Sequence, residues 1–311
     1  MKGSDMSPRA ILIAGPTASG KSSLALGLAK KLNGIIINAD ALQVYDNWRV
    51  LTARPSDAEM SQAPHKLYGH IGKTQEYSVG HWIAEITATI AETDCLPIIT
   101  GGTGLYFGAL THGLSAIPAT PNAIRTEGNR IRLDAGADWF RHHLAEFDPE
   151  TLQTLDQQNP ARLQRAWEVL EATGHGLSYW HARPTRPLIA LEETMPILLN
   201  WNINDLNSRI DSRFDQMMKS GAVEECETAR RAGFDPDLPS NRAIGAREII
   251  DALDGNIAMH DAVIKAKILT HQFAKRQRTW FRSKMKNWLQ LDMSTKPDLA
   301  AFADEIVTSF G

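Results

Sequence analysis

The sequence predicts an α/β fold in which a parallel sheet, flanked by helices, is interrupted by an all-helical insertion. Short apolar runs alternate with helical patterns up to about residue 118 and again from residue 194, whereas strand-like runs are absent in between. We therefore expect a core domain of residues 1–118 and 194–311 and a helical domain of residues 119–193. The composition, 43% hydrophobic and 22% charged, is typical of a globular protein.

The first predicted strand leads into a loop with the spacing of a phosphate-binding site. The apolar run 10–14 precedes a G-x-x-x-x-G-K-S motif, and a helical pattern that should stop at Gly34 follows it. Glycines let backbone N–H groups curl around phosphate oxygens, and the helix N-terminus favours an anion. This P-loop predicts a P-loop NTPase-like sheet that binds a di- or triphosphate, as in nucleotide- and ATP-binding proteins. The diphosphate-binding residues would be Gly15, Pro16, Thr17, Ala18, Ser19, Gly20, Lys21 and Ser22.

Two later strand ends should lie beside this loop, because ligands of α/β sheets bind at the carboxyl ends of strands. Asp40 follows the apolar run after Gly34, and a second glycine-rich turn containing Thr103 follows the run 96–100. A cap or turn role for Asp40 remains an alternative. The second strand end lacks the acidic residue that an ATPase usually carries there for Mg²⁺ and water.

Positive charge gathers near the C-terminus although the net charge is −3. Residues 265–286 contain eight Lys or Arg and no Asp or Glu. A solvated face is one interpretation, but the unbalanced sign favours binding to a nucleic-acid backbone. On a helix with about 100° per residue, the basic side carries His271, Lys275, Arg278 and Arg282, and the apolar side carries Ala262, Ala266, Leu269, Phe273 and Trp280.

Other arginines divide into paired and unpaired candidates. Arg209 lies four residues after Asp205, so an intrahelical ion pair is expected. Arg213 has no acidic residue three or four positions away, which favours a functional cation beside the phosphate site, with a solvated arginine as the alternative. Arg162 and Arg165 share a helix face, a pattern typical of a solvated surface.

The sequence indicates a cytoplasmic protein without membrane association. Its start is polar, and no apolar run approaches the roughly 20 residues needed to cross a bilayer. Cys95 and Cys226 are far apart and lack nearby histidines, which argues against a disulfide framework or a metal cluster. We expect a monomer.

Six motifs together resemble the tRNA dimethylallyltransferases (tRNA isopentenyltransferases), in the order in which that family carries them. The family transfers a dimethylallyl group from dimethylallyl diphosphate to N6 of adenosine 37, next to the tRNA anticodon, and releases diphosphate. Departures from the usual pattern are Ala41, Leu51, Asn159 and Ala246. The motifs are GPTASGKS (Gly15–Ser22), NADALQVY (Asn38–Tyr45), TARP (Thr52–Pro55), GGTGLY (Gly101–Tyr106), RAIGAR (Arg242–Arg247) and AKRQRTWFR (Ala274–Arg282).

The resemblance implies a transferase with Mg²⁺, held through Ser22, as its cofactor and with tRNA and dimethylallyl diphosphate as its partners. Asp40 would be the general base for the N6 amine, and Thr103 would hold the amine or Asp40 in line. Lys21 and Arg213 would stabilise the leaving diphosphate. The tRNA-binding residues would be Asp40, Ala41, Leu42, Gln43, Thr103, Arg125, Ala161, Arg162, Leu163, Gln164, Arg165, Arg242, Ala243, Ile244, Gly245, Ala246, Arg247, His271, Gln272, Phe273, Ala274, Lys275, Arg276, Gln277 and Arg278.

Three other functions compete with this interpretation. A P-loop kinase would explain the phosphate loop but neither the basic helix nor GGTGLY. A prenyltransferase for free adenine nucleotides would leave the insertion and the basic helix without a purpose. An RNA-binding module with a vestigial P-loop is disfavoured, because Lys21, Ser22 and Asp40 are all present.

Overall fold

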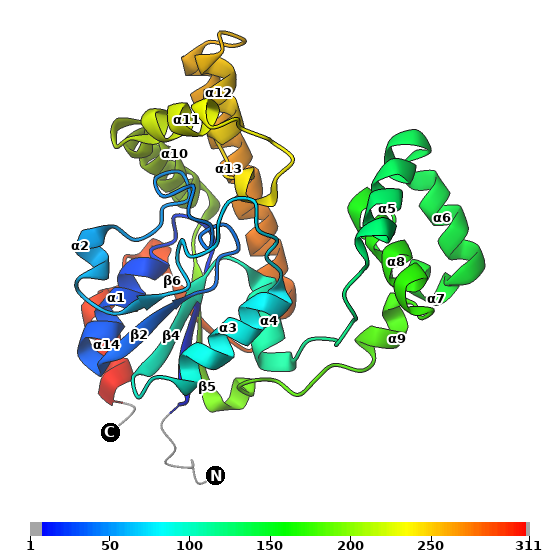
Figure 1. The fold of residues 1–311 in the computed structure, drawn as a ribbon. Coiled ribbons are helices and arrows are strands. Elements are labelled where there is room, and N and C mark those ends of the chain that lie inside the picture. The colour runs from blue at the N-terminus through cyan, green and yellow to red at the C-terminus, as the bar shows by residue number, and fades with distance from the viewer. Residues whose placement is uncertain (1–7, 309–311) are drawn as a thin grey trace. The chain divides into compact units, whose positions relative to one another are not determined.

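The computed structural model describes residues 8–308, which form two compact units. A core unit runs up to Thr111 and resumes at Leu188, and the inserted unit is His112–Pro187 (Figure 1). The sequence placed these boundaries at residues 119 and 193. The returning segment belongs to the core because the N–H groups of Leu188 and Ile189 donate to the Leu110 carbonyl.

A parallel sheet forms the centre of the core unit (Figure 1). Within residues 8–308 it has six strands in the order β3-β2-β4-β1-β5-β6, and every neighbouring pair is parallel. Strands β1 and β2 are buried along their whole length, which explains their continuous apolar runs. The strands are β1 (Ala10–Ala14), β2 (Gly34–Asn38), β3 (His65–Lys66), β4 (Leu96–Gly101), β5 (Thr194–Asn200) and β6 (Leu289–Asp292). The predicted α/β fold is confirmed.

Helices cover both faces of the sheet, as the alternation of side chains along β1 requires. Leu12 packs with α3 (Val79–Ala91) and α4 (Gly104–His112), while Ile11 and Ile13 pack with α1 (Lys21–Leu32) and α14 (Leu299–Thr308). Helix α1 ends at Leu32, and its C-cap Asn33 has a left-handed φ of 48°. Gly34 is therefore the first residue of β2, and its predicted role as the helix stop is wrong.

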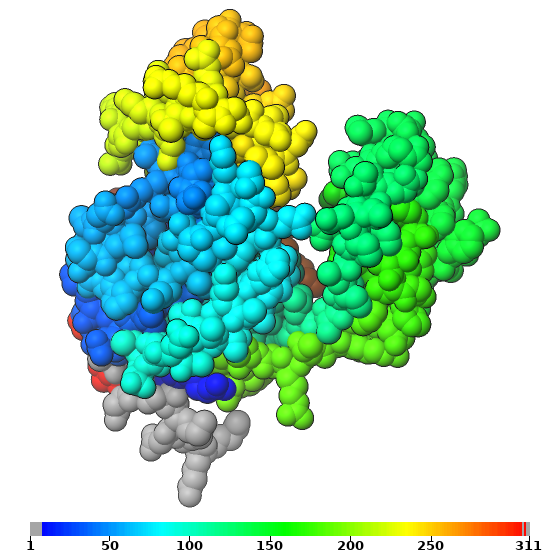
Figure 2. All heavy atoms as spheres, viewed as in Figure 1, coloured from blue at the N-terminus to red at the C-terminus, as the bar shows by residue number. Residues whose placement is uncertain are grey.

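A further layer of helices reaches the carboxyl ends of the strands. Its helices enclose a core of their own around Trp48, which is fully buried. In the space-filling view these helices, yellow to orange, lie against the blue segment that follows β2 (Figure 2). The elements are α10 (Ile203–Lys219), α11 (Ala222–Arg231), α12 (Ala246–Leu253) and α13 (Met259–Lys284), and shorter turns of helix are α2 (Asp57–Met60), η1 (Leu191–Glu193), η2 (Pro239–Asn241) and η3 (Met293–Thr295).

The inserted unit is helical and has its own apolar core. Phe140, Leu144 and Leu163 are fully buried there, beside Trp167. Asn159 caps α8 by accepting hydrogen bonds from the first N–H groups, and Gly174, with φ of 70°, ends it as predicted. The helices are α5 (Asn122–Asp134), α6 (Gly136–Phe147), α7 (Pro149–Thr154), α8 (Pro160–Thr173) and α9 (Leu177–His181).

Candidate functional site

A cavity of about 860 Å³ opens at the carboxyl ends of the strands. It is lined by the P-loop after β1, by Asp40 after β2, by Gly101 at the end of β4 and by Arg213 on α10. Loop residues near Thr52 and α13 residues close other walls. The cavity therefore brings together residues that the sequence assigned separately to phosphate binding and to chemistry.

The P-loop backbone is bent tightly around the start of α1. Ala18 and Gly20 have φ values of 61° and 93°, in the region that favours glycine. A Cβ on Gly15 would lie 2.6 Å from the Ser19 hydroxyl, so only glycine fits that position without rearrangement. The ammonium of Lys21 donates to the Pro16 carbonyl at 3.1 Å. This curled loop at a helix N-terminus has the form that binds phosphate groups.

Two side chains from distant segments hold the P-loop carbonyls. Trp201 Nε1 donates to the Ser19 carbonyl at 2.9 Å, and Arg209 Nε donates to the Ala18 carbonyl at 3.0 Å. The Arg209 guanidinium also lies over the Trp201 ring, 4.6 Å from its centroid. In the described part of the chain Arg209 forms no ion pair with Asp205, so that prediction is wrong. The Ala18 carbonyl is the partner of Arg209 instead, and only the fold brings that carbonyl within reach.

Gln277 on α13 holds the P-loop from another direction. Its side-chain carbonyl accepts the Thr17 N–H at 2.9 Å, and its amide nitrogen donates to the Gly102 carbonyl at 3.0 Å. The residue is only 6% exposed. These hydrogen bonds hold the side chain that was predicted to contact tRNA, and they occupy the Thr17 N–H as well.

Asp40 is held by its neighbours in a turn that faces the cavity. Its N–H donates to Asn38 Oδ1 at 2.8 Å, and its Oδ1 accepts the Leu42 N–H at 3.0 Å. Thr103 Oγ1 accepts the N–H of Ala41 at 3.0 Å. A Cβ on Gly102 would lie 3.4 Å from Asp40 Oδ2, so the second glycine turn passes directly beside this carboxylate. Thr103 thus positions the backbone next to Asp40.

The charged groups of the cavity act on one another. Burial lowers the pKa of Lys21 to about 8; attraction by Asp40 opposes the shift and repulsion by Arg213 adds to it. Burial and then Arg209 lower the pKa of Arg213, against the attraction of Glu59 and Asp40. A site with two cations whose charge is partly destabilised is suited to an anionic ligand.

Tyr68 and Glu59 also line the cavity, and sequence reasoning missed both. Burial raises the pKa of the Tyr68 hydroxyl, and the charges of Asp40 and Glu59 raise it further, so the phenol stays protonated. Tyr68 follows the two-residue strand β3, and the irregular sequence around that strand carries no signal that marks Tyr68 as a site residue. The pairing of β3 with β2 is what brings it to the site.

Helix α13 carries the basic run, but its faces differ from the prediction. Lys275 and Arg282 are exposed, whereas His271 lies 2.8 Å from Asp211 and Arg278 is partly buried. The buried side consists of Ala262, Ala266, Ala274, Gln277 and Phe281, so Leu269, Phe273 and Trp280 are only partly covered. The buried side is rotated from the predicted one because α13 packs on both the P-loop and α12.

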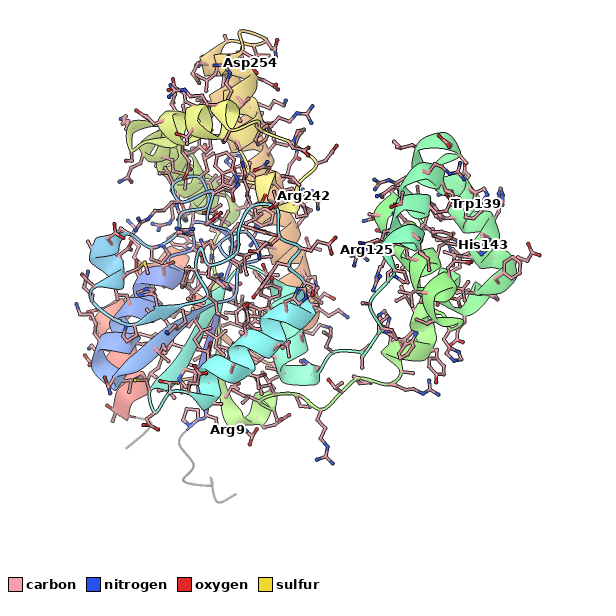
Figure 3. All side chains as sticks on the ribbon, viewed as in Figure 1. Arg9, Arg125, Trp139, His143, Arg242 and Asp254 are labelled. Carbon is pink, nitrogen blue, oxygen red and sulfur yellow. The ribbon has the colours of Figure 1, made fainter. Side chains whose placement is uncertain are left out.

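The predicted tRNA-binding residues differ in their exposure to solvent. Arg242 lies exposed in the loop before α12 and Arg247 on its first turn, whereas Arg125, on α5 of the inserted unit, is half-buried (Figure 3). Ala161 and Arg162 are exposed at the start of α8. The side chains of Leu163, Gln164, Ala243, Ala246, Ala274 and Gln277 are buried, so any RNA contact at these motifs would come from their neighbours.

The inserted unit also shows an aromatic cluster that the sequence did not single out. Trp139 and His143 stack on α6 with ring centroids 5.1 Å apart (Figure 3). His143 lies 3.2 Å from the Glu171 carboxylate of α8. These contacts join α6 to α8 and support the unit's own core.

None of the helices within residues 8–308 has the length and apolar character that crossing a bilayer requires.

Comparison with known proteins identifies the family. The model of the IPP transferase family matches residues 43–284, and that of the isopentenyl transferases matches residues 8–69. A tRNA dimethylallyltransferase of Cereibacter sphaeroides (strain KD131) is 52% identical over 92% of this chain and 89% of its own length. One from Roseobacter denitrificans is 49% identical over 91% and 98%, respectively.

Solved structures agree. The full-length tRNA isopentenylpyrophosphate transferase of Bacillus halodurans matches with a TM-score of 0.67 and 30% identity over 96% of both chains. A eukaryotic dimethylallyltransferase acting on tRNA matches with a TM-score of 0.78 and 26% identity over 92% of this chain and 74% of its own. The chain belongs to the tRNA dimethylallyltransferase (IPP transferase) family.

Proposed function

We propose that the chain transfers a dimethylallyl group from dimethylallyl diphosphate to N6 of adenosine 37 of tRNA and releases diphosphate. The observation that carries this proposal is the cavity in which Asp40, Lys21 and Arg213 meet the P-loop. The names of the curated relatives and of the eukaryotic structure support tRNA as the acceptor.

Asp40 acts as the general base in this proposal. The exocyclic amine of adenine is a weak nucleophile because its lone pair is delocalised into the ring. As the nitrogen bonds to C1 of the dimethylallyl group, the C–O bond to diphosphate breaks and the amine proton passes to Asp40. Proton transfer by a positioned carboxylate contributes typically 10²–10⁴-fold to such a rate. The hydrogen bonds from Leu42 to Asp40 and from Ala41 to Thr103 support this role, because they fix the carboxylate before substrate arrives.

The leaving diphosphate is stabilised by the P-loop, Lys21 and Arg213. Negative charge grows on its oxygens as the C–O bond breaks, and preorganised cations in a partly buried site stabilise that charge most effectively. The lowered pKa values of Lys21 and Arg213 support the role, since a bound diphosphate would restore the charge that burial disfavours. The Thr17 N–H, already bonded to Gln277, supports the loop's shape instead.

The residues present fit Mg²⁺ as a cofactor. Ser22 is exposed and lines the same cavity as Asp40. Proteins usually hold Mg²⁺ by one or two carboxylate or hydroxyl ligands together with substrate phosphates and water. No cluster of three or more His, Cys, Asp or Glu suited to a metal occurs within residues 8–308, so substrate and water would supply the remaining ligands. Mg²⁺ would supply charge neutralisation on the diphosphate.

The target adenine has to leave its stack to reach the cavity, and bases in single-stranded loops do so at the least cost. The exposed cations Lys275, Arg242 and Arg247 are suited to the phosphates of such a loop. Arg162 and Arg125 of the inserted unit are further contacts in this proposal. The chain would act as a monomer in the cytoplasm, which sedimentation and cell fractionation test.

One assay tests the function against its competitors. The protein is incubated with dimethylallyl diphosphate, Mg²⁺ and either unmodified tRNA or free AMP, and the modified adenosine is detected by mass. We expect product on tRNA alone. Product on AMP would indicate a nucleotide prenyltransferase, ATP consumption without prenylation a kinase, and tRNA binding without product an RNA-binding module.

A further inference from the structure

Gln277 connects the basic helix to both glycine turns of the site. Its two hydrogen bonds reach Thr17 and Gly102, which lie 260 and 175 residues away in the sequence. One bond uses its acceptor and the other its donor, and the side chain is 6% exposed. One donor and one acceptor of the amide are therefore committed to the two loops.

The two bonded loops carry the chemistry. Thr17 belongs to the P-loop, and Gly102 directly precedes Thr103, whose hydroxyl holds the backbone beside Asp40. These segments are in close contact, because a Cβ on Gly102 would lie 2.3 Å from Gln277 Nε2 and 3.4 Å from Asp40 Oδ2. A displacement of Gln277 must therefore move the P-loop, the Asp40 turn or both.

The neighbours of Gln277 on α13 include cations of the kind that bind nucleic-acid phosphates. Lys275 and Arg276 are exposed, and the Arg276 guanidinium lies 5.8 Å from the Phe273 ring centroid. Arg278 is partly buried, and its Nε has no hydrogen-bond partner in the described part of the chain. These cations flank Gln277 on one helix. RNA phosphates that bind them would therefore shift or hold the part of α13 whose Gln277 contacts the two loops.

We propose that Gln277 is a positioning residue that couples the two substrate sites. RNA bound to the exposed side of α13 sets the positions of Thr17 and Gly102 through the Gln277 amide, so tRNA and the prenyl diphosphate strengthen each other's binding. The effect is reciprocal, because a coupling free energy acts equally on both ligands. This inference rests on the proposed function for the identity of the two substrates.

The test compares Gln277→Met with Gln153→Met, the same change at an exposed glutamine of α7 that is not among the predicted tRNA-binding residues. The dissociation constant of the unreactive thio-analogue of dimethylallyl diphosphate is measured with and without saturating tRNA. In the wild-type chain and in Gln153→Met, we expect tRNA to tighten analogue binding by about fivefold or more, the lower end of usual coupling factors. In Gln277→Met the two constants should become equal.

The ratio of the two constants separates coupling from a merely structural role. If Gln277 only stabilised the fold, Gln277→Met would weaken the analogue equally in both measurements and leave the ratio unchanged, which overturns the proposal. A ratio of one in the wild-type chain also overturns it. If Gln277→Met does not fold, as judged by its melting curve, Gln277→Glu takes its place. Glutamate still accepts from Thr17 but sets an oxygen against the Gly102 carbonyl, so it too should lower the ratio.

Separate measurements distinguish a failure of the proposed function from a failure of the proposed coupling. Binding of the unreactive analogue is measured without turnover, whereas the function requires prenylated tRNA from the natural donor. Absence of that product in the wild-type chain overturns the proposed function, whatever the binding ratio. Product formation with an unchanged ratio in Gln277→Met overturns the coupling alone.

Discussion

Helices α8 and α13 invite comparison, because each carries cations and a buried glutamine within a motif predicted to contact tRNA. Gln164 on α8 donates to Asn129 and Glu168, at 2.9 and 2.8 Å, and both partners lie within the inserted unit. Gln277 on α13 bonds instead to the P-loop and the second glycine turn. The same residue type thus stabilises a helical core in one region and shapes a reaction site in the other.

The difference lies in what each helix packs against. Helix α8 meets other helices, whose backbone groups are already paired, so its buried amide finds side chains. Helix α13 meets loops at the ends of strands, where main-chain N–H and carbonyl groups still need partners. We therefore expect changes on α13 to alter chemistry and changes inside α8 to alter only the stability of its unit.

The largest expected effect comes from the site itself. Asp40→Ala removes the proposed base while Leu42 and Thr103 remain, so the rate of prenyl transfer should fall by about 10²–10⁴-fold. The affinity for tRNA should stay within a few-fold, since the RNA phosphates meet other residues. Single-turnover kinetics and tRNA titration measure both quantities. Turnover at the wild-type rate would remove Asp40 from the mechanism.

Lys21 should make diphosphate binding depend on pH. Its pKa in the free protein is lowered from 10.5 to about 8, so above that pH the free site loses its ammonium charge. The dissociation constant of the thio-analogue should therefore rise by up to about tenfold per pH unit above 8, as expected when the ligand binds the protonated form.

Between about pH 8 and 10.5 the folded chain binds fewer protons at Lys21 than the unfolded chain does. Burial of the charged Lys21 therefore lowers the free energy of unfolding below about pH 8, and this destabilisation fades as the pH rises to 10.5. Lys21→Arg is the control because arginine stays charged, and its binding profile should be flat across this range. A wild-type profile as flat as that of Lys21→Arg would contradict the assignment.

The exposed cations of α13 and α8 should differ from an ordinary surface lysine in their salt dependence. Lys275→Gln should weaken tRNA binding and lower the slope of log Kd against log salt by about one unit, the value of one lost phosphate contact. Arg162→Gln tests the same property on α8. Lys30→Gln on α1, where the lysine bonds to Gln62, is the matched control and should leave the slope unchanged. Equal slopes in all three would argue against the basic face of α13.

The smallest effect on activity is expected inside the inserted unit. Gln164→Met breaks the bonds to Asn129 and Glu168 and leaves Glu168, which is 8% exposed, with fewer partners. Loss of a buried polar contact costs about 1–3 kcal/mol of unfolding free energy. Thermal and denaturant unfolding measure this loss, while affinity for the thio-analogue should not change. Weaker binding of the thio-analogue would mean that α8, like α13, affects the reaction site.

The sequence by itself determined the elements whose signals are local. The spacing of Gly15–Ser22 between a strand and a helix predicted the phosphate loop, and Asp40 at the next strand end predicted a carboxylate beside it. Thr17–Ser22 and Asp40 line the same cavity. The boundaries of α8 followed from Pro160 and Gly174, because helix starts and stops depend on nearby residues. The six motifs also predicted the family that the comparisons show.

Only the tertiary structure decided which side chains hold the site together. Arg209 was assigned to an ion pair and bonds to the P-loop backbone instead, and Gln277, assigned to RNA, also bonds to that backbone. Helical periodicity tells which residues share a face but not what that face meets, and main-chain groups of a loop carry no sequence signal of their own. The partners of such groups exist only once strands and helices far apart in the chain are brought together.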